Sequence, residues 1–224
     1  MPSARTHEVI AKKINEDYGM DELLLRLGTV APDCWRNVES GVKNKYTTHF
    51  WDFSVKEGQA NNYRLFYNKY YDDINNPFYF GYLIHLMVDQ YWKTYVDPLY
   101  TFKEDGIDKC KLLDGRVIED KDYFSYYEDK KFQKHLAKKY NLSLLPVEEK
   151  DVNNFYCNIE ELNLNGLFGV NGTTSYINNK LMPDEVEEKS VLYDYGDMDK
   201  YIEDTVKFVK QEISELSSNR RNGR

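Results

Sequence analysis

The segment that most constrains the fold is residues 77–98, PFYFGYLIHLMVDQYWKTYVDP, a mostly apolar stretch with a proline near each end. Asn76 is a good helix cap, the first proline fits the first turn and the second cannot continue it, so one long helix is predicted. His85 and Asp89 are four residues apart and share one face of that helix. Such a pair can hold a metal ion or form a hydrogen-bonded pair in a core. Gly81, one turn earlier, leaves room for an ion or for another backbone.

The composition argues against several classes of protein. The chain has 224 residues and a net charge of −8, which suits one domain with a real core and does not suit wrapping nucleic-acid phosphates. No apolar run reaches the roughly 18 residues of a transmembrane segment, and the N-terminal stretch has no apolar signal core. Cys34, Cys110 and Cys157 are widely spaced and odd in number, which indicates free thiols. We therefore expect a cytoplasmic protein.

Caps, stop residues and apolar periodicity predict further helices. They are expected at residues 6–18 with Thr6 as the cap, 21–28 between Asp21 and Gly28, 57–73, 121–140, and from Asp197 onward. Residues 40–50 and 163–183 lack a period and predict loops, while Asp114-Gly115 makes a small hairpin possible within 101–120. The sequence predicts an all-α, single-domain multi-helix bundle over residues 1–217, with a flexible tail at 218–224.

Three of these helices have a predicted inward face. The faces are Leu65, Phe66 and Tyr70 in the first; Phe124, Tyr127, Phe132, Leu136 and Tyr140 in the second; and Ile202, Val206, Val209, Ile213 and Leu216 in the last. The last set steps by four and three residues, which is the spacing of an amphipathic helix that closes a core.

Five candidate metal ligands come from four separate segments of the predicted bundle. They are His7, Asp33, His49, His85 and Asp89. Inward-facing ligands from different helices are how bundles build metal sites, and histidine with aspartate suits zinc or a similar first-row divalent ion. Five ligands exceed what one tetrahedral zinc needs. Either one carboxylate bridges two ions, or one of the five supports a ligand without touching the ion.

The order and the residue sequences of these segments resemble those of the zinc-dependent phospholipase C family. The S1/P1-type nucleases share the fold of that family more distantly. The matching pieces are His7, Leu27–Asp33 (LGTVAPD), Thr48–Phe50 (THF) and Gly81–Asp89 (GYLIHLMVD), within roughly the first 95 residues. The resemblance implies a helical fold of that type and a zinc-dependent hydrolase.

The resemblance also implies a division of the ligands. Asp33, His49, His85 and Asp89 would hold one zinc, and Asp89 would bridge to a second zinc that also takes His7. The family's third zinc needs two more histidines shortly after the central helix, and residues 95–111 contain none. One or two zinc ions are therefore expected.

A zinc site of this kind would cleave a phosphoester bond in a small phosphoester or phospholipid-like substrate through a metal-activated water. Asp33 is the candidate catalytic base, or a plain ligand. Trp51, Tyr82 and Trp92 are candidate pocket walls, with core packing as the alternative. Lys93 either meets a substrate phosphate or is solvated.

Two other classes are less favoured by the sequence. No histidine precedes an aspartate, as helical HD-type phosphohydrolases require, and no HExxH motif of a metallopeptidase is present. A non-catalytic protein, derived from the same fold and stabilised by a metal, remains the alternative.

Overall fold

The computed structural model describes residues 2–33, 41–52, 54, 62–119, 121–142, 159–162 and 189–222. This part of the chain is mostly helical and carries one small antiparallel sheet, so the expected helical class is confirmed and a purely α architecture is not. The helices are α1 (Ala4–Asn15), α2 (Glu22–Val30), α3 (Gly41–Thr48), α4 (Tyr63–Lys69), α5 (Pro77–Tyr91), α6 (Asp97–Tyr100), α7 (Lys121–Lys139) and α10 (Tyr195–Asn222). The loop predicted at 163–183 lies outside the described residues.

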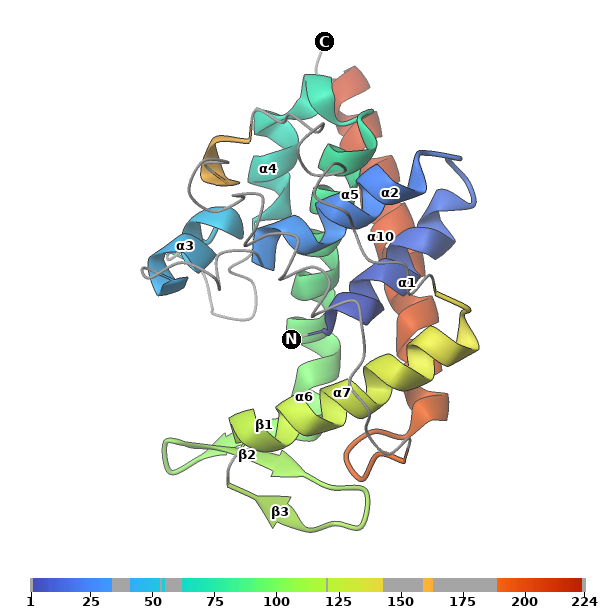
Figure 1. The fold of residues 1–224 in the computed structure, drawn as a ribbon. Helices are drawn as coiled ribbons and strands as arrows, with labels where there is room; N and C mark the ends of the chain where they lie inside the picture. Colours follow the sequence, from blue (N-terminus) through green and yellow to red (C-terminus); the bar gives the residue numbers. More distant parts are fainter. Residues whose placement is uncertain are drawn as a thin grey trace.

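Helix α5 is the centre of the molecule, and Figure 1 shows α2 crossing it, with α10 and α1 beside it. Every residue from Phe78 to Asp89 is buried, as the apolar segment predicted. Asn76 caps the helix by accepting a hydrogen bond from the backbone N–H of Phe78, and Pro77 occupies the first turn.

Two glycines allow α2 and α5 to cross with their backbones in contact. A Cβ at Gly81 would lie 2.3 Å from the Leu25 carbonyl oxygen, and a Cβ at Gly28 would lie 2.1 Å from the Phe78 carbonyl oxygen. Gly81 therefore makes room for another backbone. The prediction that Gly28 stops α2 is wrong, because the helix continues to Val30. Gly28 instead allows the backbone of α5 to approach closely.

The first two helices begin close to their predicted positions. Ser3, and not Thr6, caps α1 by accepting from the backbone N–H of Thr6, so the helix begins earlier than expected. It ends at Asn15, before the predicted end at residue 18. Asp21 caps α2 as predicted, by accepting from the backbone N–H of Leu24.

Residues 41–48 form α3, so the predicted loop over 40–50 is wrong. The helix ends in a Schellman motif, in which the N–H of Trp51 bonds the carbonyl of Tyr46 and the N–H of Phe50 bonds that of Thr47. Phe50 takes the left-handed position (φ 51°) that usually belongs to glycine. Its ring is 6% exposed and packs edge-on against Phe66, which offsets the backbone cost. The usual helix-stop signal was therefore missing from the sequence.

Two predicted inward residues face solvent. Leu65 is 52% exposed, because the buried face of α4 is Tyr63, Phe66, Tyr67 and Tyr70 at helical spacing, and Leu65 lies off it. Tyr127 in α7 is 42% exposed, whereas Phe132 and Leu136 are buried as predicted.

The central helical segment does not end at Pro98. After α5, residues Trp92–Val96 form a π-helical turn, in which the N–H of Asp97 bonds the carbonyl of Trp92, and α6 follows. The altered register lets Pro98 sit in the first turn of α6, where its missing N–H costs nothing. π-helical turns occur frequently at functional sites, and this one begins three residues after Asp89.

A three-stranded antiparallel sheet follows, formed by β1 (Thr101–Glu104), β2 (Ile107–Lys111) and β3 (Val117–Ile118) in that order. The possible hairpin around Asp114-Gly115 is present, and a second turn at Asp105-Gly106, with both residues at positive φ, joins β1 to β2. Cys110 in β2 is a buried free thiol, as expected, and Cys34 and Cys157 lie outside the described residues.

Helix α10 closes the core against α1 and α5. Its predicted stripe, Ile202, Val206, Val209, Ile213 and Leu216, is buried throughout. The helix continues to Asn222, into the segment predicted as a flexible tail. Within the described residues, no helix has the length and apolarity needed to cross a bilayer.

Candidate metal centre

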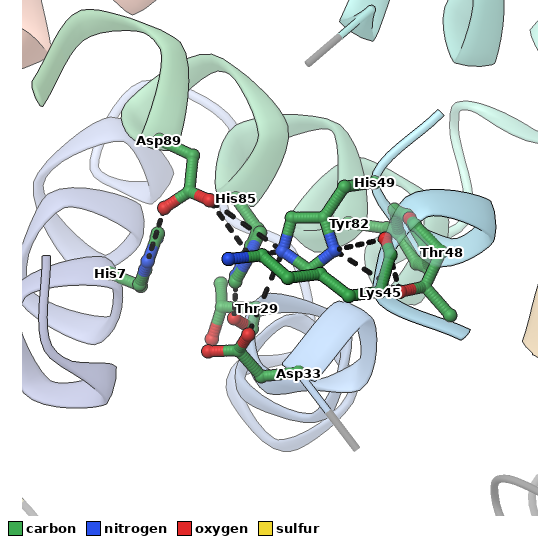
Figure 2. Close-up of polar contacts among 9 residues, drawn as sticks. All are labelled: His7, Thr29, Asp33, Lys45, Thr48, His49, Tyr82, His85 and Asp89. Atoms are coloured by element: carbon green, nitrogen blue, oxygen red, sulfur yellow. Dashed lines mark hydrogen bonds and ion pairs between the residues drawn. The ribbon is translucent and has the colours of Figure 1, made fainter. Parts of the chain in front are cut away.

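The five predicted ligands meet at one place in the fold, although they come from four segments. His7 lies on α1, Asp33 follows α2, His49 follows α3, and His85 and Asp89 lie on α5. Figure 2 shows the side chains of His49, His85, Asp33 and Asp89 directed toward one another, with His7 beside Asp89. The crossing at Gly81 and the end of α3 at Phe50 are the two backbone features that bring these segments together.

The first imidazole, His85, has its tautomer set by the neighbouring backbone. Its Nδ1 lies 2.7 Å from the carbonyl oxygen of Thr29 on α2. A carbonyl oxygen can only accept, so Nδ1 carries the proton and donates it. Nε2 consequently presents a lone pair toward the centre of the site.

The second imidazole, His49, is set in the same way. Its Nδ1 lies 3.0 Å from the carbonyl oxygen of Lys45 and 3.1 Å from the hydroxyl of Thr48. Nδ1 therefore donates to the Lys45 carbonyl, and Nε2 again carries a lone pair. The two Nε2 atoms of His49 and His85 are 3.3 Å apart. Two lone pairs at that distance repel unless a cation or a proton lies between them.

Two carboxylates complete the group around these nitrogens. Nε2 of His49 lies 3.6 Å from Oδ1 of Asp33 and 3.6 Å from Oδ2 of Asp89. Nε2 of His85 lies 4.0 Å from the same Asp89 oxygen. In a tetrahedral zinc site with bonds of about 2.0–2.1 Å, two ligand atoms are about 3.3–3.4 Å apart. The distances around the two Nε2 atoms run from 3.3 to 4.0 Å, at or above this spacing. The ligand atoms lie within 4.8 Å of one another in two groups of three, namely Asp33, His49 and His85, and His7, His85 and Asp89.

His7 lies on the other side of Asp89. Its Nε2 is 3.5 Å from Oδ1 of Asp89, and its ring stacks on that of His85 with centroids 4.0 Å apart. His7 is 1% exposed, and neither of its ring nitrogens makes a hydrogen bond within the described part of the chain. Asp89 thus directs one oxygen to His49 and His85 and the other to His7, which is the arrangement of a bridging carboxylate.

Burial and neighbouring charges together keep His49, His85 and Asp89 in their metal-binding forms at neutral pH. Burial, reinforced by the neighbouring His7, lowers the pKa of His85 to about 3. Burial also lowers the pKa of His49. Burial by itself would raise the pKa of Asp89, but contact with His7 and the charges around it hold that pKa well below its usual value. A cation would meet neutral imidazoles and an ionised Asp89 carboxylate.

Among the five side chains, that of Asp33 is the most accessible to solvent. The side chain of Asp33 is 17% exposed, whereas those of the other four residues are at most 2% exposed.

Two of the three candidate pocket residues take the alternative role of core packing. Tyr82 is fully buried, stacks on Phe66 and donates its hydroxyl proton to the carbonyl of Thr48. Trp92 is 4% exposed and donates its indole proton to Thr205 on α10. Trp51 alone is half-buried, two residues after His49.

Sequence reasoning missed the groups that orient the ligands. The carbonyl oxygens of Thr29 and Lys45 fix the two imidazoles, and a backbone carbonyl has no signature in the sequence. The two glycines Gly28 and Gly81 are the sequence feature that could have indicated the close contact between α2 and α5. That contact places the Thr29 carbonyl next to His85.

The metal-free protein is expected to lose stability as the pH falls from 6.5 toward 3. In this window the unfolded chain protonates a histidine of ordinary pKa, 6.5, while folded His85, with a pKa of about 3, does not. The unfolded state then binds more protons, so each such histidine lowers the unfolding free energy by up to about 1.4 kcal/mol per pH unit. Urea unfolding of chelator-treated protein at a series of pH values measures the slope. His85→Gln should give a shallower slope, and an unchanged slope would contradict the assignment.

In the comparisons with known proteins, no family model, curated protein or solved structure matched the chain. The functional argument therefore depends on the geometry of the site.

Proposed function

We propose that this protein is a zinc-dependent hydrolase that cleaves a phosphoester bond. The observation that carries the proposal is the pair of Nε2 lone pairs of His49 and His85, 3.3 Å apart and flanked by Asp33 and Asp89. A cation is the occupant that relieves this repulsion without protonating a buried imidazole. A set of two imidazoles and two carboxylates suits zinc among divalent ions.

His49, His85 and Asp89 would hold the first ion, and its fourth position would be left to a water beside Asp33. His7 and the second oxygen of Asp89 would contribute to a second ion. When bound, zinc supplies a hydroxide nucleophile at neutral pH and offsets negative charge on a phosphoryl oxygen. Of the five side chains, that of Asp33 is the most exposed, so Asp33 would orient the attacking water and accept its proton.

The phospholipase C-like fold is part of the same proposal. The segments that carry the resemblance are the ones that converge, namely α1, the end of α2, the end of α3 and α5. This convergence supports a small phosphoester or a phospholipid-like molecule as the substrate class, with one or two zinc ions as cofactor.

A structural metal site is the second candidate, and one observation favours it. The side chains of His7, His49, His85 and Asp89 are at most 2% exposed. With Asp33 as a fourth ligand beside His49, His85 and Asp89, a tetrahedral zinc would have no open position. Such a site would stabilise the bundle without catalysis. The role of Asp33 separates the two candidates.

Asp33→Asn is expected to retain zinc and to lose at least about 100-fold in hydrolysis of a generic phosphodiester, because the amide cannot accept the water's proton. Elemental analysis of the purified protein gives the zinc content, and bis(p-nitrophenyl) phosphate reports the activity. Asp204→Asn on the exposed face of α10 is the matched control. Zinc-loaded wild-type protein that is stabilised by the metal but hydrolyses no phosphoester would establish the structural candidate instead.

A further inference from the structure

Lys93 belongs to the helical segment that carries two of the candidate ligands, and its ammonium contacts an aromatic ring. It follows Asp89 by four residues, within the π-helical turn. Its Nζ lies 4.4 Å from the centroid of the Trp51 ring, a cation–π contact. Trp51 itself follows His49 by two residues, so the contact joins the segments that carry two of the ligands.

The positive charge of Lys93 reaches the site. It contributes, after burial, to the lowered pKa of His49, and it is among the charges that counter the effect of burial on Asp89. Lys45 on α3 supplies a second positive charge near His49. Two lysines thus come within electrostatic range of a centre whose own residues are two imidazoles and two carboxylates.

The net charge of the zinc-loaded site indicates what a nearby lysine would contribute. One zinc ion with Asp33, Asp89 and two neutral imidazoles has no net charge, and the chain as a whole carries −8. A neutral centre in an acidic protein does not attract a phosphate anion strongly. An ammonium at the edge of the site would provide the missing attraction, locally and next to the ion.

We propose that Lys93, positioned by the ring of Trp51, binds a phosphoryl oxygen of the substrate and so makes the site selective for anionic esters. This inference rests on the proposed function, because it requires a metal at His49, His85 and Asp89. A substitution of Lys45 would test this inference less directly, because the backbone carbonyl of Lys45 also orients His49.

The test is the binding of inorganic phosphate to the zinc-loaded full chain, measured by calorimetry. Lys93→Met should weaken phosphate binding about 10-fold with zinc content unchanged, because one charge-assisted contact is lost. Lys93→Arg should restore most of the affinity. Lys207→Met removes a lysine on the exposed face of α10 and should change nothing. Trp51→Leu should give a smaller loss, because the ammonium remains but is no longer held.

The outcomes separate this inference from the proposed function. A wild-type protein that takes up no zinc overturns both. Normal zinc content with unchanged phosphate affinity in Lys93→Met overturns the inference alone. Repeating the titration with glycerol 3-phosphate and with a short-chain phosphatidylcholine distinguishes a small phosphoester from a lipid headgroup, and a Lys93-dependent affinity for either one supports the contact.

Discussion

Replacing His85 with Gln and Asp89 with Asn in one variant is expected to abolish zinc binding and the stabilisation that zinc provides. Asp89 directs one carboxylate oxygen toward each of the two candidate metal positions. His85 contributes one of the two Nε2 lone pairs that face each other at the first position. Both replacements keep the volume of the buried side chain, and glutamine can still donate to the Thr29 carbonyl, so the fold should be retained. Alanine at these positions would add cavities and leave that carbonyl unpaired.

Thermal unfolding with and without added zinc measures the effect. A ligand present at about 100 times its dissociation constant stabilises the folded state by about 2.7 kcal/mol, so wild-type protein should melt at a higher temperature with zinc and the double variant should not. His135→Gln is the matched control, because His135 stacks on Tyr195 away from the site and should leave the zinc effect intact. A double variant that still gains stability from zinc would show that the metal binds elsewhere.

Gly81→Ala is expected to lower the free energy of unfolding by at least about 2 kcal/mol, although alanine is intrinsically the better helix former. The new Cβ would meet the Leu25 carbonyl at 2.3 Å and the Thr29 backbone nitrogen at 3.1 Å. These are backbone atoms, so only a movement of α2 away from α5 relieves the contact. The same movement would draw the Thr29 carbonyl away from His85, so zinc affinity should fall as well.

Urea unfolding of the metal-free protein tests the stability effect, and zinc titration tests the coupling to the site. Gly196→Ala is the control, because its nearest neighbour is the end of the Asp194 side chain, which can move. Gly28→Ala should behave like Gly81→Ala, and since both disturb one contact their costs should not add. A Gly81→Ala protein as stable as wild type would mean that the two helices have room to separate.

The elements with strong local signals could be predicted from the sequence. Asn76 with Pro77, Asp21 as a cap and the stripe on α10 each depend on neighbouring residues only, and the structure contains all three. The elements without such signals could not. The end of α3 uses Phe50 where glycine is usual, and the π-helical turn carries the helical segment past Pro98. Both depend on packing partners that are distant in the sequence.

The sequence by itself determined which side chains can bind a metal: three imidazoles and two carboxylates, with His85 and Asp89 on one face of a buried helix. The tertiary structure decided how they are presented. The carbonyls of Thr29 and Lys45 select the tautomers, the α2–α5 crossing sets the distances, and Trp51 positions Lys93. The physical reason is that chemical type belongs to each residue alone, whereas orientation depends on backbone groups and contacts that form only when distant segments pack together.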